Sequence, residues 1–296
     1  MASLAWAMLI AVWVKLRAFC PQFEGLETEL EAKKEDHERA RRLLWRKGKT
    51  PEVAAASANL ALRVSQVRGI PQTLGSKRYV RLIRACLAAN LLKLLRLAPD
   101  ERVYLVTLVP AGHAFTIDEL MQVDPGLLVQ RLRVTLGRCG ANPRVSGWAF
   151  GYLDGEYNLA TGLFQLHWHL IVTGDLIKVF QRLKRRTAYK SVKRVADSPD
   201  GVATRVHIQE VDDPQNPRPL TYAMKGSWYA RWRGETGDNE DEVQRVVGPR
   251  VRIPEPYHSH VLLWLDKWEF NDMLIMTNLK LGHGTLYRVQ VPNTCY

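Results

Sequence analysis

One run of residues constrains the fold more than any other part of the sequence: Phe164-Gln-Leu-His-Trp-His-Leu-Ile-Val172. Its apolar and aromatic residues predict a buried strand over 163–172. A second strand is expected over 146–157, and the turn-like residues 158–162 between the two predict a hairpin. This hairpin implies an antiparallel sheet.

Other elements are expected before and after the hairpin. Strands are expected over 103–109 and 204–211, and helices over 116–137, 175–195 and 220–231. Their order predicts an α+β domain over residues 99–233, in which an antiparallel sheet carries helices on one side.

The two flanking regions differ from this domain in character. Residues 1–98 are expected to form an N-terminal helical region, and residues 234–296 an acidic loop with a C-terminal helical and strand extension. The elements expected in them are helices over 24–49, 51–66, 79–97 and 258–268 and a loop over 235–242.

The chain is strongly basic. Lys and Arg number 42 against 30 Asp and Glu, which gives a formal net charge of +12 and a pI near 9.7. Clustered cations release condensed counterions when they meet a phosphate backbone, so the favoured partner is a polyanion. Charge alone does not separate nucleic acid from an anionic membrane surface. A hydrophobic share of 46% excludes a disordered chain.

Cysteine usage and the N-terminus bear on the compartment. Four cysteines lie far apart without CxxC spacing, which predicts neither a disulfide framework nor a zinc knuckle and favours the reducing cytoplasm. The apolar run Leu4–Val14 is shorter than the roughly 20 residues that span a bilayer. It is expected to form a buried or interfacial helix, so no stable membrane partner is expected.

Two histidines on one strand face suggest a metal site. Side chains at positions i and i+2 of a strand share a face, so His167 and His169 project together, and Gln165 joins them. Two imidazoles form half a site for a divalent ion. Asp154 and Glu156 on the preceding strand are both candidates for the missing acidic ligand, and Gln165 is a further candidate ligand. The pair His258 and His260 precedes a helical run, where i and i+2 do not share a face, and is interpreted as structural.

A tyrosine and a lysine follow downstream in Thr221-Tyr-Ala-Met-Lys-Gly226. On a helix, residues three apart lie about 5 to 6 Å apart at Cβ, so Tyr222 and Lys225 are expected to share a face. The ammonium could favour a phenolate and balance charge that develops on a phosphate oxygen.

The order of these elements resembles the three motifs of the HUH superfamily of single-strand endonucleases. The first motif corresponds to Tyr104-Leu-Val-Thr-Leu108, the second to His167-Trp-His169 and the third to Tyr222-Ala-Met-Lys225. The resemblance covers about residues 100–230 and is nearest to rolling-circle replication initiators with one catalytic tyrosine. It implies a ferredoxin-like or RRM-like palm for the α+β domain.

The resemblance also implies a reaction. A divalent ion, Mg²⁺ or Mn²⁺, would polarise the scissile phosphate of single-stranded DNA at a replication origin or hairpin of a plasmid or phage. Tyr222 would attack that phosphate to leave a 5′-phosphotyrosine link and a free 3′-hydroxyl, with Lys225 orienting the tyrosine. No Walker-type phosphate loop is present, so a host helicase and a polymerase are expected partners.

Other functions stay open from sequence. A transposase or relaxase of the same superfamily would share this chemistry, and a catalytically inactive DNA-binding protein would share the fold. A membrane-surface protein would leave the histidines and the tyrosine unexplained.

Cations and aromatic residues further suggest a DNA-binding surface. Tyr229 lies seven residues after Tyr222, on the same face if the helix continues, and is a candidate second nucleophile. Aromatic residues beside Arg231 could stack the bases of a single strand. The predicted DNA-binding cations are Arg182, Lys184, Arg185, Arg186, Lys190, Lys193, Arg194 and Arg231.

Overall fold

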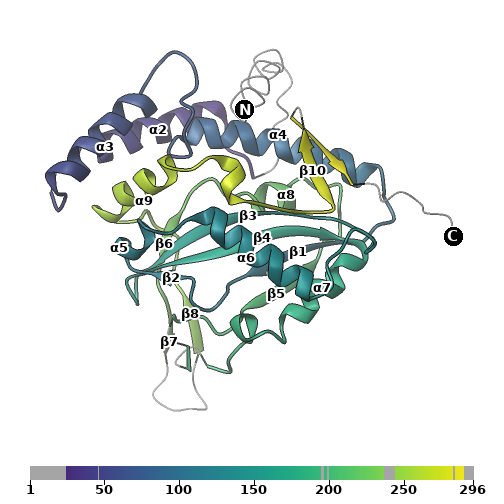
Figure 1. The fold of residues 1–296 in the computed structure, drawn as a ribbon. Helices are drawn as coiled ribbons and strands as arrows, with labels where there is room; N and C mark the ends of the chain where they lie inside the picture. Colours follow the sequence, from purple (N-terminus) through teal and green to yellow (C-terminus); the bar gives the residue numbers. More distant parts are fainter. Residues whose placement is uncertain are drawn as a thin grey trace.

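The chain folds around a central sheet of mostly antiparallel strands (Figure 1). The computed structural model describes residues 25–45, 47–194, 197–198, 200–236, 244–282 and 284–289. The strand order is β5-β1-β4-β3-β6, while β2 also pairs with β4 and β9 with β3. These strands are β1 (Val103–Leu108), β2 (Ala114–Phe115), β3 (Ala149–Asn158), β4 (Leu163–Thr173), β5 (Val206–Glu210), β6 (Tyr229–Arg231) and β9 (Leu274–Thr277).

All pairings in this sheet are antiparallel except the parallel pairing of β3 with β6. The predicted α+β class, with helices packed against an antiparallel sheet, is confirmed. Two small hairpins lie outside the sheet: β7 (Arg233–Thr236) with β8 (Gln244–Val247), and β10 (Leu279–Gly282) with β11 (Thr285–Arg288).

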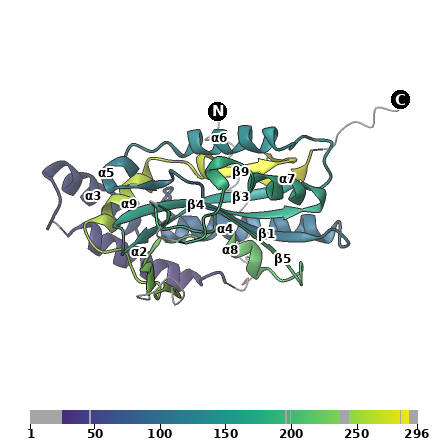
Figure 2. The same cartoon turned by 90° about the horizontal axis from the view of Figure 1, so that it is seen from below.

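Helices lie on both faces of the sheet, whereas the prediction placed them on one side. In Figure 2, α6 and α7 cover one face, and α8 lies on the other face together with α4 from the N-terminal region. The helices are α2 (Glu29–Leu43), α3 (Pro51–Val64), α4 (Lys77–Arg96), α5 (Ile117–Leu120), α6 (Pro125–Arg138), α7 (Ile177–Leu183), α8 (Arg218–Tyr222) and α9 (Tyr257–Asp266). Short 3₁₀ helices occupy Gly174–Leu176, Thr187–Tyr189 and Phe270–Met273.

The N-terminal helices are joined to one another and to α8 by buried polar contacts. Asp36 on α2 accepts hydrogen bonds from the Ser76 hydroxyl and pairs with Arg78, both near the start of α4. Arg84 on α4 donates to the carbonyl of Thr221 in α8. Because these groups are almost fully buried, each needs its partner to offset the loss of water. Contacts therefore cross the predicted domain boundary at residue 98. The predicted boundary at residue 233 is crossed as well, because β9 from the C-terminal region pairs with β3.

Three predicted helices are wrong in extent. The helix expected over 116–137 is divided in two because Asp124 caps a new helix that begins at Pro125. The helix expected over 175–195 ends at Leu183, and turns with a short 3₁₀ helix follow. The helix expected over 220–231 ends at Tyr222, after which the chain enters β6.

Two predictions concern the ends of the chain and the acidic loop. The apolar run Leu4–Val14 lies outside the described residues. Within the described ranges, none of the helices combines the length and apolar character that a bilayer crossing requires. The loop expected over 235–242 begins as strand instead, since Glu235 and Thr236 belong to β7, and its remaining residues are not described.

Candidate active site

The register of the β3–β4 hairpin selects one acidic residue as the partner of the two histidines. Asp154 lies directly opposite His167, and Tyr152 lies opposite His169. Side chains alternate along a strand, so Asp154, His167 and His169 point from the same sheet face. Their exposed fractions are 2%, 8% and 2%, so the sheet and α8 shield them from bulk water.

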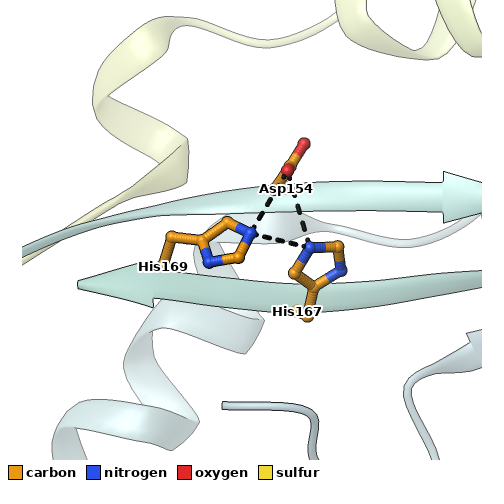
Figure 3. Close-up of side chains that lie close together, drawn as sticks. All are labelled: Asp154, His167 and His169. Atoms are coloured by element: carbon orange, nitrogen blue, oxygen red, sulfur yellow. Dashed lines mark hydrogen bonds and ion pairs between the residues drawn. The ribbon is translucent and has the colours of Figure 1, made fainter. Parts of the chain in front are cut away.

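The ligand atoms of these three residues converge, as Figure 3 shows. The two histidine Nε2 atoms are 3.1 Å apart, and Asp154 Oδ2 lies 3.5 Å from that of His167 and 3.6 Å from that of His169. Two ligands at right angles around an ion, each about 2.1 Å from it, lie about 3.0 Å apart. The spacing therefore suits a small divalent ion, and the three residues could hold one.

Hydrogen bonds on the far side of each imidazole indicate which nitrogen carries the proton. His167 Nδ1 is 3.2 Å from the carbonyl of Gln165, which can only accept, so its Nε2 carries a lone pair. His169 Nδ1 is 3.0 Å from Thr107 Oγ1, and its Nε2 is 2.9 Å from Lys225 Nζ, which can only donate. In neutral rings with these tautomers, both Nε2 atoms carry the lone pair that binds a metal, and Lys225 donates to that of His169.

The charges of the cluster agree with this assignment. Burial and the charges of His167 and Lys225 lower the pKa of His169 well below its ordinary value, so its imidazole is neutral. Burial alone would raise the pKa of Asp154, but the nearby His167 and Lys225 lower it to about 2. A carboxylate and two imidazole nitrogens form a donor set that favours a cation.

Tyr222 and Lys225 lie against this cluster, although not as one face of a helix. Tyr222 is the last residue of α8, and Lys225 lies in the turn beyond it. The Tyr222 ring centroid is 4.8 Å from that of His169, and Lys225 Nζ is 4.3 Å from the Tyr222 centroid. Lys225 Nζ also lies 3.7 Å from Asp154 Oδ2. Tyr222 and Lys225 therefore lie close to His169 and Asp154.

The turn that brings Lys225 back to the sheet depends on a close approach at β3. A Cβ atom at Gly155 would lie 2.5 Å from the ring of Trp228, which forbids a larger residue without a shift of the ring. Trp228 precedes β6, whose parallel pairing places Tyr229 beside Glu156. This packing fixes the chain after α8 next to the strand that carries Asp154.

The other two candidate ligands lie one register step away. Glu156 and Gln165 face each other across the hairpin. Glu156 pairs with Arg233 and lies 3.8 Å from Arg231 Nε, so its charge is already balanced. The Gln165 amide nitrogen donates to the carbonyl of His113, and Glu156 does not belong to the converging group.

The sequence was compared with family models, curated proteins and solved structures. No family model matches it, and comparison with curated proteins and with solved structures found no significant similarity. The site geometry is therefore the basis for the functional argument.

Most of the predicted DNA-binding cations do not lie beside Tyr222. Arg182 is on α7, which covers the opposite face of the sheet (Figure 2). Arg194 lies 3.8 Å from Asp197 in the segment that leads to β5. Arg231 is the exception, since it lies in β6 near Glu156, and burial lowers its pKa. The others, in turns and the 3₁₀ region after α7, are Lys184, Arg185, Arg186, Lys190 and Lys193.

One residue that the sequence analysis did not assign contacts the cluster directly. Thr107 on β1 lies opposite His169 across the β1–β4 ladder, and its hydroxyl fixes the orientation of that imidazole. A polar residue inside the otherwise apolar run 103–109 was the available signal. The pair His258 and His260 lies in α9, where His258 is 3.4 Å from Glu255, in agreement with a structural role.

Proposed function

We propose that the protein is a metal-dependent enzyme that nicks and rejoins single-stranded DNA through a 5′-phosphotyrosine intermediate. The observation that carries the proposal is the contact between the Tyr222 ring and His169, one of three buried ligands that could hold an ion. Burying the charges of the cluster costs free energy, so the cluster has few structural reasons to exist. Its contact with a phenol therefore suggests a functional site.

The arrangement of three sequence-distant segments supports the proposal. β1 contributes Thr107, the hairpin contributes the three ligands, and α8 with its turn contributes Tyr222 and Lys225. These are the segments in which the sequence resembles the HUH endonuclease motifs. A reaction that uses all three motifs requires these segments to lie together. Packing of unrelated segments does not.

The donor set fits a divalent ion, and the chain's own residues supply the rest of the chemistry. A bound ion would polarise the scissile phosphate and offset its negative charge. Mg²⁺ and Mn²⁺ are the proposed ions; the imidazoles favour Mn²⁺ relative to Mg²⁺. Asp154, His167 and His169 would hold it, with Thr107 orienting His169.

Tyr222 would act as the nucleophile. As its Oη bonds to phosphorus, the bond from phosphorus to the 3′ oxygen breaks, so the fragment that begins with the scissile phosphate stays on the protein through its 5′ end. The phenolic proton leaves to solvent, and the departing 3′ oxygen gains a proton to become a hydroxyl. The ammonium of Lys225, beside the ring, would balance negative charge that develops during the attack. Attack by a 3′-hydroxyl on the phosphotyrosine reverses these changes and joins a strand.

The biological setting is part of the proposal. A free 3′-hydroxyl can prime synthesis, which suits initiation of rolling-circle replication of a plasmid or phage. The proposed partners are single-stranded DNA at an origin or hairpin, together with a host helicase and polymerase, and the proposed compartment is the cytoplasm. The formal charge of +12 favours such a polyanion.

The test compares Tyr222 at the end of α8 with Tyr229 at the start of β6. Labelled single-stranded oligonucleotides are incubated with the full chain and Mn²⁺, and protein-linked fragments are detected on a denaturing gel. Tyr222→Phe is expected to abolish the covalent adduct, because the ring stays in place without its hydroxyl. Tyr229→Phe is the matched control, since Tyr229 lies in β6 beneath Arg250 and is expected to keep the full adduct yield.

Two results would contradict the proposal. An adduct that survives Tyr222→Phe would move the nucleophile elsewhere. Loss of the adduct in Tyr229→Phe but not in Tyr222→Phe would make Tyr229 the nucleophile.

A further inference from the structure

A small basic cavity adjoins Tyr222. Its volume is about 230 Å³, and it lies between the N-terminal helix α4, the end of α8 and the segment after β8. Among the described residues that line it, one side chain, Glu27, is acidic. The cations that line it are Lys77, Arg84, Arg218, Lys225 and Arg250.

Two of these cations are held away from bulk water. Lys77 and Arg84 on α4 are only 8% and 5% exposed. Both pair with the same carboxylate, since Glu27 Oε1 is 3.0 Å from Lys77 Nζ and Oε2 is 2.8 Å from Arg84. Arg84 Nε is buried and has no hydrogen-bond acceptor in the described part of the chain. One carboxylate balances two buried cations, so the cavity keeps a surplus of positive charge that favours an anion.

The cavity opens toward a larger one that can accept more of a chain. An adjoining cavity of about 660 Å³ shares six residues with it: Gly25, Glu27, Lys77, Ser227, Tyr229 and Arg250. Tyr229 is 37% exposed, and the Arg250 guanidinium lies 5.9 Å from its ring centroid. A cation and an aromatic face at the junction suit a sugar-phosphate chain with bases, and a free anion needs no such continuation.

We propose that the small cavity binds one phosphate of the DNA strand, next to the phosphate that Tyr222 attacks, between Lys77 of α4 and Arg250. The identity of the strand rests on the proposed function. The inference gives the N-terminal helical region, which lies outside the endonuclease resemblance, a direct part in substrate binding.

Equilibrium binding without metal tests this independently of cleavage. The full chain is titrated with a fluorescent oligomer of about twelve thymidines in EDTA at several salt concentrations. For single strands, the logarithm of the binding constant falls with the logarithm of salt concentration by about 0.7 per neutralised phosphate. If Lys77 and Arg250 hold the same phosphate, the double variant Lys77→Gln, Arg250→Gln is expected to reduce the slope by about 0.7, not by about 1.4.

The control is Arg133→Gln, an exposed cation on α6 that lies on the opposite face of the sheet (Figure 2). It is expected to leave the slope unchanged. Arg250→Gln alone alters an exposed side chain and is expected to weaken binding about fivefold, which guards against misfolding of the buried Lys77 variant.

An unchanged slope in Arg250→Gln and in the double variant would overturn the inference, as would a fall of about 1.4. Stabilisation of the chain by inorganic phosphate together with an unchanged slope would assign the cavity to a free anion, which also overturns it. Loss of the metal-dependent adduct bears only on the proposed function, because this assay contains neither metal nor cleavage.

Discussion

Replacing Asp154 by asparagine distinguishes the two carboxylates that the sequence offered as ligands. The matched control is Glu156→Gln, one step along the same strand face, where the carboxylate pairs with arginines. Both changes remove one negative charge from β3 and keep the side-chain shape. Only the first removes the charge of a carboxylate whose oxygen lies 3.5 and 3.6 Å from the two Nε2 atoms.

The expected magnitude follows from the number of ligands. Groups that only orient a ligand change metal affinity by about 10- to 100-fold. Loss of the negative charge on one of three direct ligands is therefore expected to weaken Mn²⁺ binding by at least about 100-fold, or about 2.7 kcal/mol. Glu156→Gln is expected to change it less than about threefold, because Glu156 contacts Arg231 and Arg233 instead.

Titration calorimetry with Mn²⁺ measures both affinities, and thermal melting checks that each variant is folded. Equal losses in the two variants, or a larger loss in Glu156→Gln, would refute the assignment of Asp154.

Three further predictions concern groups around the site and the N-terminal helices. Thr107→Val is expected to weaken Mn²⁺ binding about tenfold in calorimetry while Thr107→Ser preserves it, since the hydroxyl orients His169; equal affinities would contradict this role. Lys225→Gln is expected to tighten Mn²⁺ binding severalfold, because it removes a like charge 3.7 Å from the Asp154 oxygen, yet to slow adduct formation at least tenfold. An unchanged rate of adduct formation in Lys225→Gln would contradict a role for Lys225 in the reaction. Burial raises the pKa of Glu35, but Arg252 and Arg39 lower it to about 2, so its ion pairs stabilise the fold above pH 4.5 and are lost as pH falls toward 2. Glu35→Gln is expected to lower the free energy of unfolding by about 2 kcal/mol at pH 7 in urea titrations, and a difference that persists at pH 2 would contradict the linkage.

Local patterns made the central hairpin predictable from sequence. Strand alternation alone placed His167 and His169 on one face, and that placement needs no distant contact. The choice between Asp154 and Glu156 depended on the hairpin register, which the turn residues do not determine at one-residue precision.

Helix boundaries were less predictable, although some signals were present. Asp124 followed by Pro125 is a typical helix start, and it divides the helix expected over 116–137. The helix expected over 175–195 is also too long, because Leu183 is the last residue of α7. In both cases the expected helix runs past a residue at which a helix begins or ends in the structure.

Contacts between distant segments account for what the sequence did not reveal. Lys225 reaches the cluster through a turn fixed by Trp228 against Gly155, and helical spacing does not produce that contact. Lys77 and Arg250 line the cavity beside Tyr222 from opposite ends of the chain. Residues so far apart share no local pattern, so only the folded chain brings them together.

Peptide mapping of the covalent product tests the central claim most directly. The full chain is incubated with single-stranded DNA and Mn²⁺, digested, and analysed by mass spectrometry for the nucleotide-bearing peptide. The account predicts that the modification lies on the peptide that contains Tyr222, and that His167→Ala with His169→Ala removes it. A modified peptide from another part of the chain, or an adduct that forms equally well without both histidines, would contradict the account.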